Sequence, residues 1–588
     1  MGGEVATVGF LDAADDRELA PWARRAAWTS LVVCTLGLVA VAAAGPRGFD
    51  LSDEGWYWLA ARHPLSFVRS STQFQFPLND LLDLIGWSVP AARILRLVLV
   101  SAATAGFGVV FVRLVRHRLG DEPTPTTWVL LAAVIAAAGF ASTWYPPSPS
   151  YNDLALIGVL VGSAASVNAI VRAQRPVLVE SASWFVAGLA AWLVLMVKFS
   201  AVGAFVAAGI AALVISWGTW TARRWVVAIA SVAVGMGAAA LVWHVRYLSL
   251  SDTLDGIRAG IDETSGSAHS PLTLLGTAAV SVVVLGLLGV VVWIGIRVDR
   301  GRLQLPVALG VLVGIGAVGL AFVAISSTKR SAIAGMLVPC LVAFVAYLIA
   351  PAFTARWREV DATRRKIVVT TGSLLAVLPL LYSFGTANPL VNGATPATAI
   401  WLILAVLAAA WSRADVSPVV GMAAPVAVAV AALAGVGLIW ISPYDQVDLR
   451  DSTMPITDRS PISSVTLDVQ KATAIDEAIA AMDDAAGSRP RNLLTFFSLP
   501  GLAYATDSAT PGLLFEPNEV ARTEGVIDRA CAQRRPLFIG VNETGGALPD
   551  WVTERLASAC RIDPDTDLRP LVTIEAQGDR VEILLVER

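Results

Sequence analysis

The stretch WTSLVVCTLGLVAVAAAGPRGFDLSDEGWYW, residues 28–58, decides the fold of this chain. Its first part, residues 28–44, is apolar and approaches the roughly 20 residues that a helix needs to cross a membrane. Its second part places two adjacent carboxylates, Asp53 and Glu54, just ahead of a short aromatic run. Aromatic residues next to a span are typical of the membrane–water boundary. The stretch therefore predicts a spanning helix followed by a loop that holds two carboxylates at that boundary.

The apolar signal recurs along the chain. Of the 588 residues, 56% are hydrophobic and 15% are charged, which is too apolar for an ordinary soluble enzyme. Runs of spanning length are centred near residues 39, 100, 134, 160, 193, 210, 234, 284, 313, 342, 375, 404 and 430. The block 184–216 exceeds one crossing and holds a charge at its middle, so we expect two short helices that meet at Lys198. The expected fold class is an α-helical polytopic membrane protein with about 13 transmembrane helices.

Arginines gather in alternate loops, which predicts that these loops face the cytoplasm. The N-terminal segment, residues 1–27, is then cytoplasmic, and no cleavable signal peptide is evident. The large first loop, residues 46–92, is then extracytoplasmic. The expected location of the protein is the plasma membrane, which the chain crosses many times. Cys531 and Cys560 also lie outside, where a disulfide is permitted, but their spacing alone leaves that bridge open.

The composition turns polar after residue 442. Residues 28–442 are the expected transmembrane domain, and residues 443–588 are an expected extracytoplasmic soluble α/β domain. In the latter we expect strands at 492–498 and 536–542, helices at 519–532 and 551–559, and a hairpin at 571–586.

Two outer loops have features of their own. In the first loop, residues 57–62 and 79–87 have helix-period apolar positions, which predicts helices that lie in the membrane interface with their apolar faces down. A second outer loop, residues 249–270, is acidic and contains glycine and serine, so we expect it to be mobile.

The pair Asp53 and Glu54 has two interpretations. Ser52 or Asp53 could cap an interfacial helix, with Glu54 favouring the helix dipole. Alternatively, one carboxylate removes a proton from an acceptor hydroxyl, and its neighbour holds the geometry or a divalent cation such as Mg²⁺ or Mn²⁺.

The order of motifs around this pair resembles that of the GT-C superfamily of integral-membrane glycosyltransferases, in particular the protein-mannosyltransferase-like and aminoarabinose-transferase-like branches. The resemblance covers roughly residues 28–440, and its elements are Asp53-Glu54-Gly-Trp-Tyr, Phe76-Pro77-Leu78, Ala91-Ala-Arg93, Pro149-Ser-Tyr-Asn152, Lys198-Phe-Ser and Gly385-Thr-Ala-Asn388. It implies a polyprenyl-phosphate sugar donor, with Asp53 as the catalytic base and Glu54 as its partner. Lys198 precedes Phe-Ser where many relatives have Pro-Thr, and the loop at Asn388 matches only approximately.

Cations at the outer ends of spans are candidate phosphate ligands. Lys198 and Lys329 lie there against the inside-positive trend, and the alternative is that they only snorkel to the surface. A lysine point charge and a forked arginine both bind phosphate oxygens well. We expect Lys329 and Arg330 to bind the donor phosphate, followed by Lys198 and Arg93 in order of preference.

A polar cluster joins the third and fourth expected spans, with Tyr145, Tyr151, Asn152 and Asp153 as its members. Nearby prolines favour a simple turn in which Asn152 or Asp153 caps the fourth span. The alternative is that these residues bind sugar hydroxyls beside Asp53. His63 and His269 also lie outside, but they show no metal-ligand spacing, so the sequence leaves a metal unassigned.

No phosphate loop, dinucleotide fingerprint or zinc-finger spacing is found in the sequence, and no nucleic-acid partner is expected. The expected partners are a polyprenyl-phosphate-linked sugar, membrane lipid, and an extracytoplasmic glycan, lipid or protein that accepts the sugar. Two other functions stay open at this point: a transporter or flippase of lipid-linked sugars, and a scaffold whose outer domain recruits partners.

Overall fold

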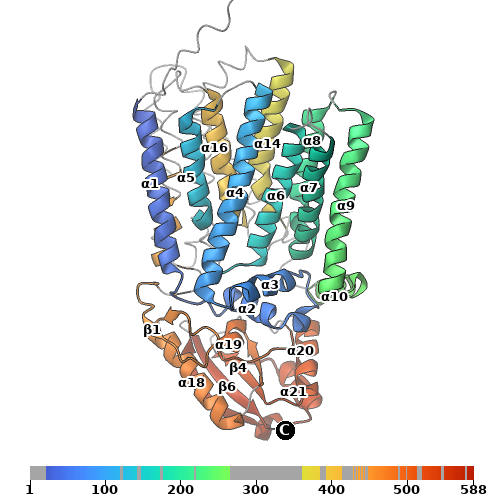
Figure 1. Cartoon of the computed structure of the whole chain (residues 1–588). Coiled ribbons are helices and arrows are strands. Elements are labelled where there is room, and N and C mark those ends of the chain that lie inside the picture. The colour runs from blue at the N-terminus through green and yellow to red at the C-terminus, as the bar shows by residue number, and fades with distance from the viewer. Residues whose placement is uncertain are drawn as a thin grey trace, which may run out of the picture.

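The computed structural model describes residues 21–119, 123–141, 147–171, 177–217, 220–264, 361–384 and 393–412, parts of 425–447, and 448–587 with gaps at 488–489, 498, 513–519, 544–547 and 577–578. Long helices stand side by side at one end, and a smaller domain with a sheet occupies the other end (Figure 1). A layer of short helices lies between the two.

Seven of the described helices are long and apolar enough to cross a membrane. They are α1 (Pro21–Ala44), α4 (Val89–Leu119), α6 (Tyr151–Val171), α7 (Val177–Val197), α8 (Val202–Ser216, extended by η2, Phe199–Ala201), α9 (Ala222–Arg246) and α14 (Ala362–Ser383). Two shorter apolar helices, α5 (Pro125–Ala141) and α16 (Thr398–Ser412), pack with them, α16 being preceded by the single turn η4 (Thr395–Ala397). Lipid can cover exposed leucine and valine side chains on such helices, so the bundle indicates a membrane-embedded protein.

These helices account for nine of the expected apolar runs. The break at Lys198 is confirmed, because α7 ends at Val197 and α8 begins at Val202. The runs centred near residues 284, 313 and 342 lie outside the described residues, and the run near residue 430 is only partly described.

The layer between bundle and domain consists of α2 (Asp53–Arg62), η1 (Pro64–Phe67), α3 (Gln75–Leu84) and α10 (Leu250–Thr264). The two helices expected in the first loop are found. Their position in the membrane interface stays a prediction, but α2 does not lay an apolar face on lipid. Its residues from Tyr57 to Ala61 are all buried, because the bundle lies on one side of α2 and the C-terminal domain on the other.

The expected mobility of residues 249–270 is wrong for the part that the structure describes. Residues 250–264 form α10, which packs its glycines against the first loop. A Cβ atom on Gly256 would lie 2.6 Å from the Val68 carbonyl oxygen, and one on Gly260 would lie 2.4 Å from the Ser70 carbonyl carbon. Glycine thus allows close backbone packing here, where composition alone suggested a flexible loop.

The C-terminal domain has a four-stranded sheet with strand order β3-β4-β6-β5. β3 and β4 are parallel, and the other two pairs are antiparallel. The strands are β3 (Asn492–Phe496), β4 (Leu537–Asn542), β5 (Leu568–Ala576) and β6 (Asp579–Val586), and a two-residue pair, β1 (Met454–Pro455) with β2 (Thr466–Leu467), lies beside them. The helices are α18 (Val469–Ala486), α19 (Pro500–Ala505), α20 (Val520–Ala532), α21 (Asp550–Cys560) and α22 (Pro564–Asp567).

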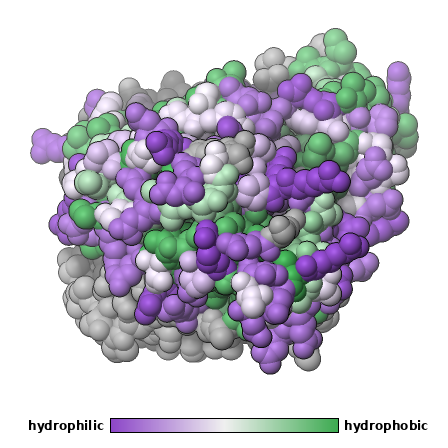
Figure 2. Space-filling model, turned by 90° about the horizontal axis from the view of Figure 1, so that it is seen from below, coloured by the Kyte–Doolittle hydropathy of each residue, from purple (hydrophilic) through white to green (hydrophobic). Residues whose placement is uncertain are grey.

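Helices cover both faces of this sheet. Leu494 and Ile539 pack with Val526 of α20 and Val552 of α21, whereas Leu493 faces the core that contains α18. Alternation along each strand explains this division. The strands and helices expected from the sequence are found; α18 and α19 were not expected. The outer end of the domain carries mostly hydrophilic side chains, with smaller hydrophobic areas between them (Figure 2).

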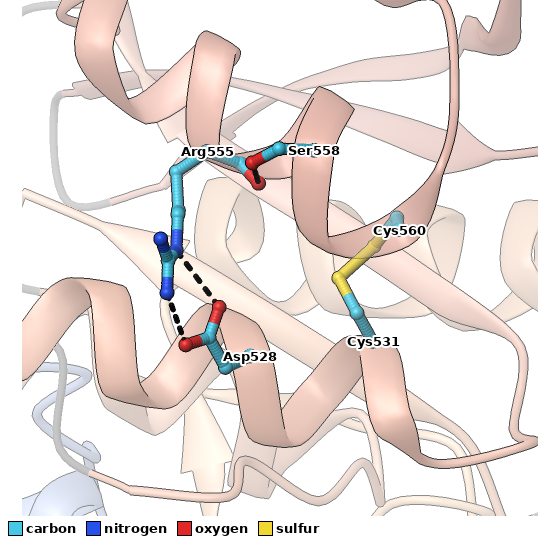
Figure 3. Close-up of a disulfide and its surroundings, with 5 residues drawn as sticks. All are labelled: Asp528, Cys531, Arg555, Ser558 and Cys560. Carbon is cyan, nitrogen blue, oxygen red and sulfur yellow. Dashed lines mark hydrogen bonds and ion pairs between the residues drawn. A yellow bond between two sulfur atoms is a disulfide. The ribbon is translucent and has the colours of Figure 1, made fainter.

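A disulfide joins Cys531 at the end of α20 to Cys560 at the end of α21 (Figure 3). An ion pair between Asp528 and Arg555 links the same two helices. The bridge that the sequence left open is therefore present in this structure.

Candidate functional site

All of the sequence-predicted site residues that the structure describes lie where the bundle meets the helix layer. They are Asp53, Glu54, Arg93, Tyr151, Asn152, Asp153 and Lys198. The remaining ones, Tyr145, Lys329, Arg330 and Asn388, lie outside the described residues. Apart from Asp53 and Asp153, the described site residues divide into two groups with different surroundings.

The first group is the Arg93 network, which consists of Asp50, Ser52, Glu54, Arg93 and Ser148. Glu54 is fully buried, and Arg93 donates to both of its carboxylate oxygens at 2.8 and 3.0 Å. The Ser148 hydroxyl and the Asp50 backbone N–H donate to the same carboxylate. A buried carboxylate with this many donors is held in one position.

Arg93 also holds the end of α1 and the start of the first loop. Its guanidinium donates to the carbonyl oxygens of Gly45 at 2.7 Å, Arg47 at 2.8 Å and Gly48 at 2.9 Å. An arginine has five N–H donors, and here all the terminal nitrogens and Nε face protein acceptors. Arg93 therefore fixes the loop; its expected role at the donor phosphate stays a prediction that would require these bonds to rearrange.

The N-terminus of α2 is organised by a residue that neither cap interpretation considered. The Asp50 carboxylate accepts from the backbone N–H groups of Ser52 and Glu54, each at 2.9 Å. Ser52 stands at the N-cap without a side-chain capping bond, and Asp53 is the first helical residue. Ser52 therefore holds the N-cap position, as one interpretation expected, but Asp50 accepts the backbone hydrogen bonds at this end, and Asp53 is not the cap.

The second group is the lysine site, which consists of Tyr151, Asn152, Lys198 and Tyr382. Asp53 begins the helix α2, which packs against Tyr151. The Lys198 side chain is only 4% exposed, and its Nζ donates to the Asn152 side-chain oxygen at 3.0 Å. Nζ also lies 4.4 Å from the ring centroid of Tyr382 and 5.9 Å from that of Tyr151. No carboxylate forms an ion pair with Lys198 among the residues that the structure describes.

Tyr151, the first residue of α6, links the lysine to the carboxylate. Asp53 is the first residue of α2, the helix that packs against the Tyr151 ring, so Asp53 and the lysine lie at the same end of the bundle. The Tyr151 ring packs against Trp56 and Tyr57 of α2 and against Phe74, with centroid separations of 6.1, 5.8 and 5.8 Å. Edge and tilted ring contacts of this kind fix orientation.

Asp153 belongs to neither group. It is buried and pairs with Arg96 of α4 at 2.7 Å, while the Ser150 backbone N–H donates to it at 3.0 Å. Asp153 therefore ties α6 to α4. Its expected contact with sugar hydroxyls stays a prediction.

Sequence reasoning missed four contributors. Asp50 accepts the backbone hydrogen bonds at the start of α2. Ser148 and Arg96 complete the buried ion pairs, and Tyr382 donates to the Asn152 backbone oxygen at 2.8 Å. Tyr382 lies in α14, 230 positions from Asn152. Arg96, an arginine inside an apolar span, was a visible signal, since intramembrane charges are rare and usually paired.

Among the described residues, no three His, Cys, Asp or Glu side chains are grouped so that they could hold a metal ion. The possible Mg²⁺ or Mn²⁺ stays a prediction that the described residues do not support.

No protein-family model matches this chain, and no curated protein matches it either.

Proposed function

We propose that the protein is a membrane glycosyltransferase that moves a sugar from a polyprenyl-phosphate donor to an extracytoplasmic glycan, lipid or protein. One observation carries the proposal: a buried lysine without a carboxylate partner in the described residues lies beside Tyr151, and the Tyr151 ring packs against α2, the helix that begins at the Asp53 carboxylate. A buried, unpaired cation is costly, and an anionic ligand would offset that cost. The phosphate of a lipid-linked donor would supply the anion at this depth, with its tail in lipid.

The proposed reaction is a single displacement at the anomeric carbon. The acceptor oxygen forms a bond to this carbon from the face opposite the leaving group, and the bond to the phosphate oxygen breaks, so the configuration inverts. Asp53 takes the proton from the acceptor hydroxyl. Lys198 neutralises the negative charge that the departing phosphate gains, as placed cations do for developing charge.

The orientation and the full number of spans belong to the same proposal. We propose about 13 spans, a cytoplasmic N-terminus and an extracytoplasmic C-terminal domain in the plasma membrane. The Cys531–Cys560 disulfide supports the outer location of that domain, because disulfides persist in oxidising compartments. Tyr151 and Asn152 would line the donor site, and Lys329, Arg330, Tyr145 and Asn388 stay candidates for further contacts.

The test is transfer of label from a panel of radiolabelled polyprenyl-phosphate sugars in membranes that contain the wild-type protein or Lys198→Met. Transfer by the wild type that falls strongly in the variant supports the proposal and identifies the donor sugar. Movement of labelled lipid to the opposite leaflet without transfer to any acceptor would instead favour the flippase.

A further inference from the structure

The C-terminal domain makes backbone contacts with the loop that carries Asp53. The Gly501 backbone N–H of α19 donates to the Leu51 carbonyl at 2.7 Å. A Cβ atom built on Gly55 would lie 2.1 Å from the Gly501 Cα, and one built on Gly501 would lie 2.6 Å from the Leu51 oxygen. The two backbones therefore touch within two residues of Asp53, as α2 and α19 do in Figure 1.

A second contact comes from α18. Lys471 is buried, and its Nζ donates to the Phe49 carbonyl oxygen at 3.0 Å. Burial of a lysine is tolerated only where its donors find acceptors. The bond therefore fixes the loop two residues before Leu51.

A third contact is an isolated β-bridge between Arg47 of the loop and Thr466 of β2. The Gly48 N–H donates to Thr466 at 2.8 Å, and the Thr466 N–H donates to Pro46 at 2.9 Å. Ring contacts of Tyr504 with Phe49 and Trp58, at 6.2 and 5.7 Å, add packing from α19. Residues 46–58 are thus held by the Arg93 network on the bundle side and by the C-terminal domain on the other side.

We infer that Gly501 and Lys471 are positioning residues that fix Asp53 for the transfer reaction; this role rests on the proposed function. In this view the C-terminal domain contributes to catalysis by holding the loop that carries Asp53, in addition to any part it has in acceptor binding. Neither residue is placed to touch the donor. A displaced Asp53 would slow the chemical step and leave donor binding at Lys198 unchanged. Small misplacements of a catalytic group reduce rates by as much as a hundredfold.

The test compares Gly501→Ala with Gly525→Ala in the full-length protein. A Cβ on Gly525 of α20 would approach only the Arg529 side chain, at 3.3 Å, so this variant is the matched control. We expect kcat to fall on the order of tenfold or more in Gly501→Ala, with the donor KM within about twofold of wild type. We expect the control to keep both constants. An unchanged kcat in Gly501→Ala, or a fall that the control shares, would overturn the inference.

Amide hydrogen exchange gives a measurement that does not depend on activity. Gly501→Ala, and Lys471→Met as a second variant should the first not fold, should speed exchange in residues 46–56 while the strands β3 and β4 keep their protection. Exchange that is unchanged in residues 46–56, or faster throughout the domain, would overturn the inference. If the wild type transfers no sugar, the proposed function fails, while this exchange experiment still decides whether the domain holds the loop.

Discussion

Glu54 and Lys198 are both buried charges at the same end of the bundle, but their surroundings differ. Glu54 accepts from Arg93, Ser148 and the Asp50 backbone, so its charge is satisfied within the protein. Lys198 has one amide oxygen and two tyrosine rings, and no carboxylate among the described residues. The first arrangement holds the structure together. The Lys198 ammonium group, which has no carboxylate partner among the described residues, could still bind an anion. The comparison indicates that burial alone does not assign a role to a charged residue.

The largest expected effect is a loss of stability when the Glu54 carboxylate is removed from the Arg93 network. Glu54→Ala should destabilise the protein by about 3–5 kcal/mol, because it leaves Arg93 buried without its counter-charge. Thermal unfolding of purified protein in detergent would measure this loss. Glu477→Ala, at an exposed position in α18, is the matched control and should unfold close to wild type. A stable Glu54→Ala protein would contradict the structural role.

Lys198→Met tests whether the second buried charge serves activity and not stability. It should leave stability unchanged or higher, because it removes a buried cation that has no ion-pair partner in the described residues. A charge-assisted hydrogen bond contributes about 1.5–3 kcal/mol, so kcat/KM for the donor should fall roughly 10- to 100-fold. Lys366→Met, near the opposite end of the bundle, is the matched control and should keep activity. Loss of stability without loss of donor binding would make Lys198 a structural residue.

Two substitutions at Tyr382 distinguish its ring contact with Lys198 from its hydrogen bond to Asn152. Tyr382→Phe keeps the ring below Lys198 but loses the bond to Asn152, which is worth about 1 kcal/mol, so kcat/KM should fall less than tenfold. Tyr382→Leu loses the ring as well and should cost more activity. Equal activity of the two variants in the donor-transfer assay would show that the ring contact does not matter.

The smallest expected effect is on the stability contributed by the ion pair between Asp80 of α3 and Arg246 of α9. The hydrogen bond from Arg246 to Asp80 holds the pKa of this carboxyl below its ordinary value, with a further contribution from Tyr247. Because the pKa is lower in the folded protein, the stabilisation is complete above the unfolded pKa of about 3.9 and is lost as the pH falls through the folded value. Asp80→Asn should therefore destabilise at pH 7 by about 1 kcal/mol or less.

The stability difference between wild type and Asp80→Asn should shrink at pH values below the unfolded pKa. Unfolding curves at pH 7 and at acid pH would measure it. A difference that is independent of pH would contradict the assignment of the effect to this carboxylate.

Periodicity predicted much of the fold. The break at Lys198 followed from block length and charge alone, and the α/β elements after residue 490 followed from alternation and turn residues. The burial of α2 between the bundle and the C-terminal domain did not follow from the sequence, because an aromatic helix face can pack against lipid or protein equally well. The packing of α10 depends on Gly256 and Gly260 meeting the backbone of residues 68–71. Composition cannot distinguish that close contact from flexibility.

The candidate site was predictable only in part. Asp53, Tyr151, Asn152 and Lys198 were recognised as polar residues at the ends of apolar runs. The structure brings the last three into contact and places Asp53 at the same end of the bundle. That Glu54 faces Arg93 and Asp53 does not cap α2 could not be read from the sequence, since both depend on helix orientation. Tyr382 was missed because its partner, Asn152, is 230 positions away.

The most direct test of the account is a paired measurement on Asp53→Asn and Glu54→Gln: the amount of folded protein and the rate of sugar transfer from the polyprenyl-phosphate donor. The account predicts that Asp53→Asn folds like the wild type and transfers sugar on the order of 10²- to 10⁴-fold more slowly, as expected when a general base is lost. It predicts that Glu54→Gln mainly loses folded protein. Wild-type transfer by folded Asp53→Asn would contradict it.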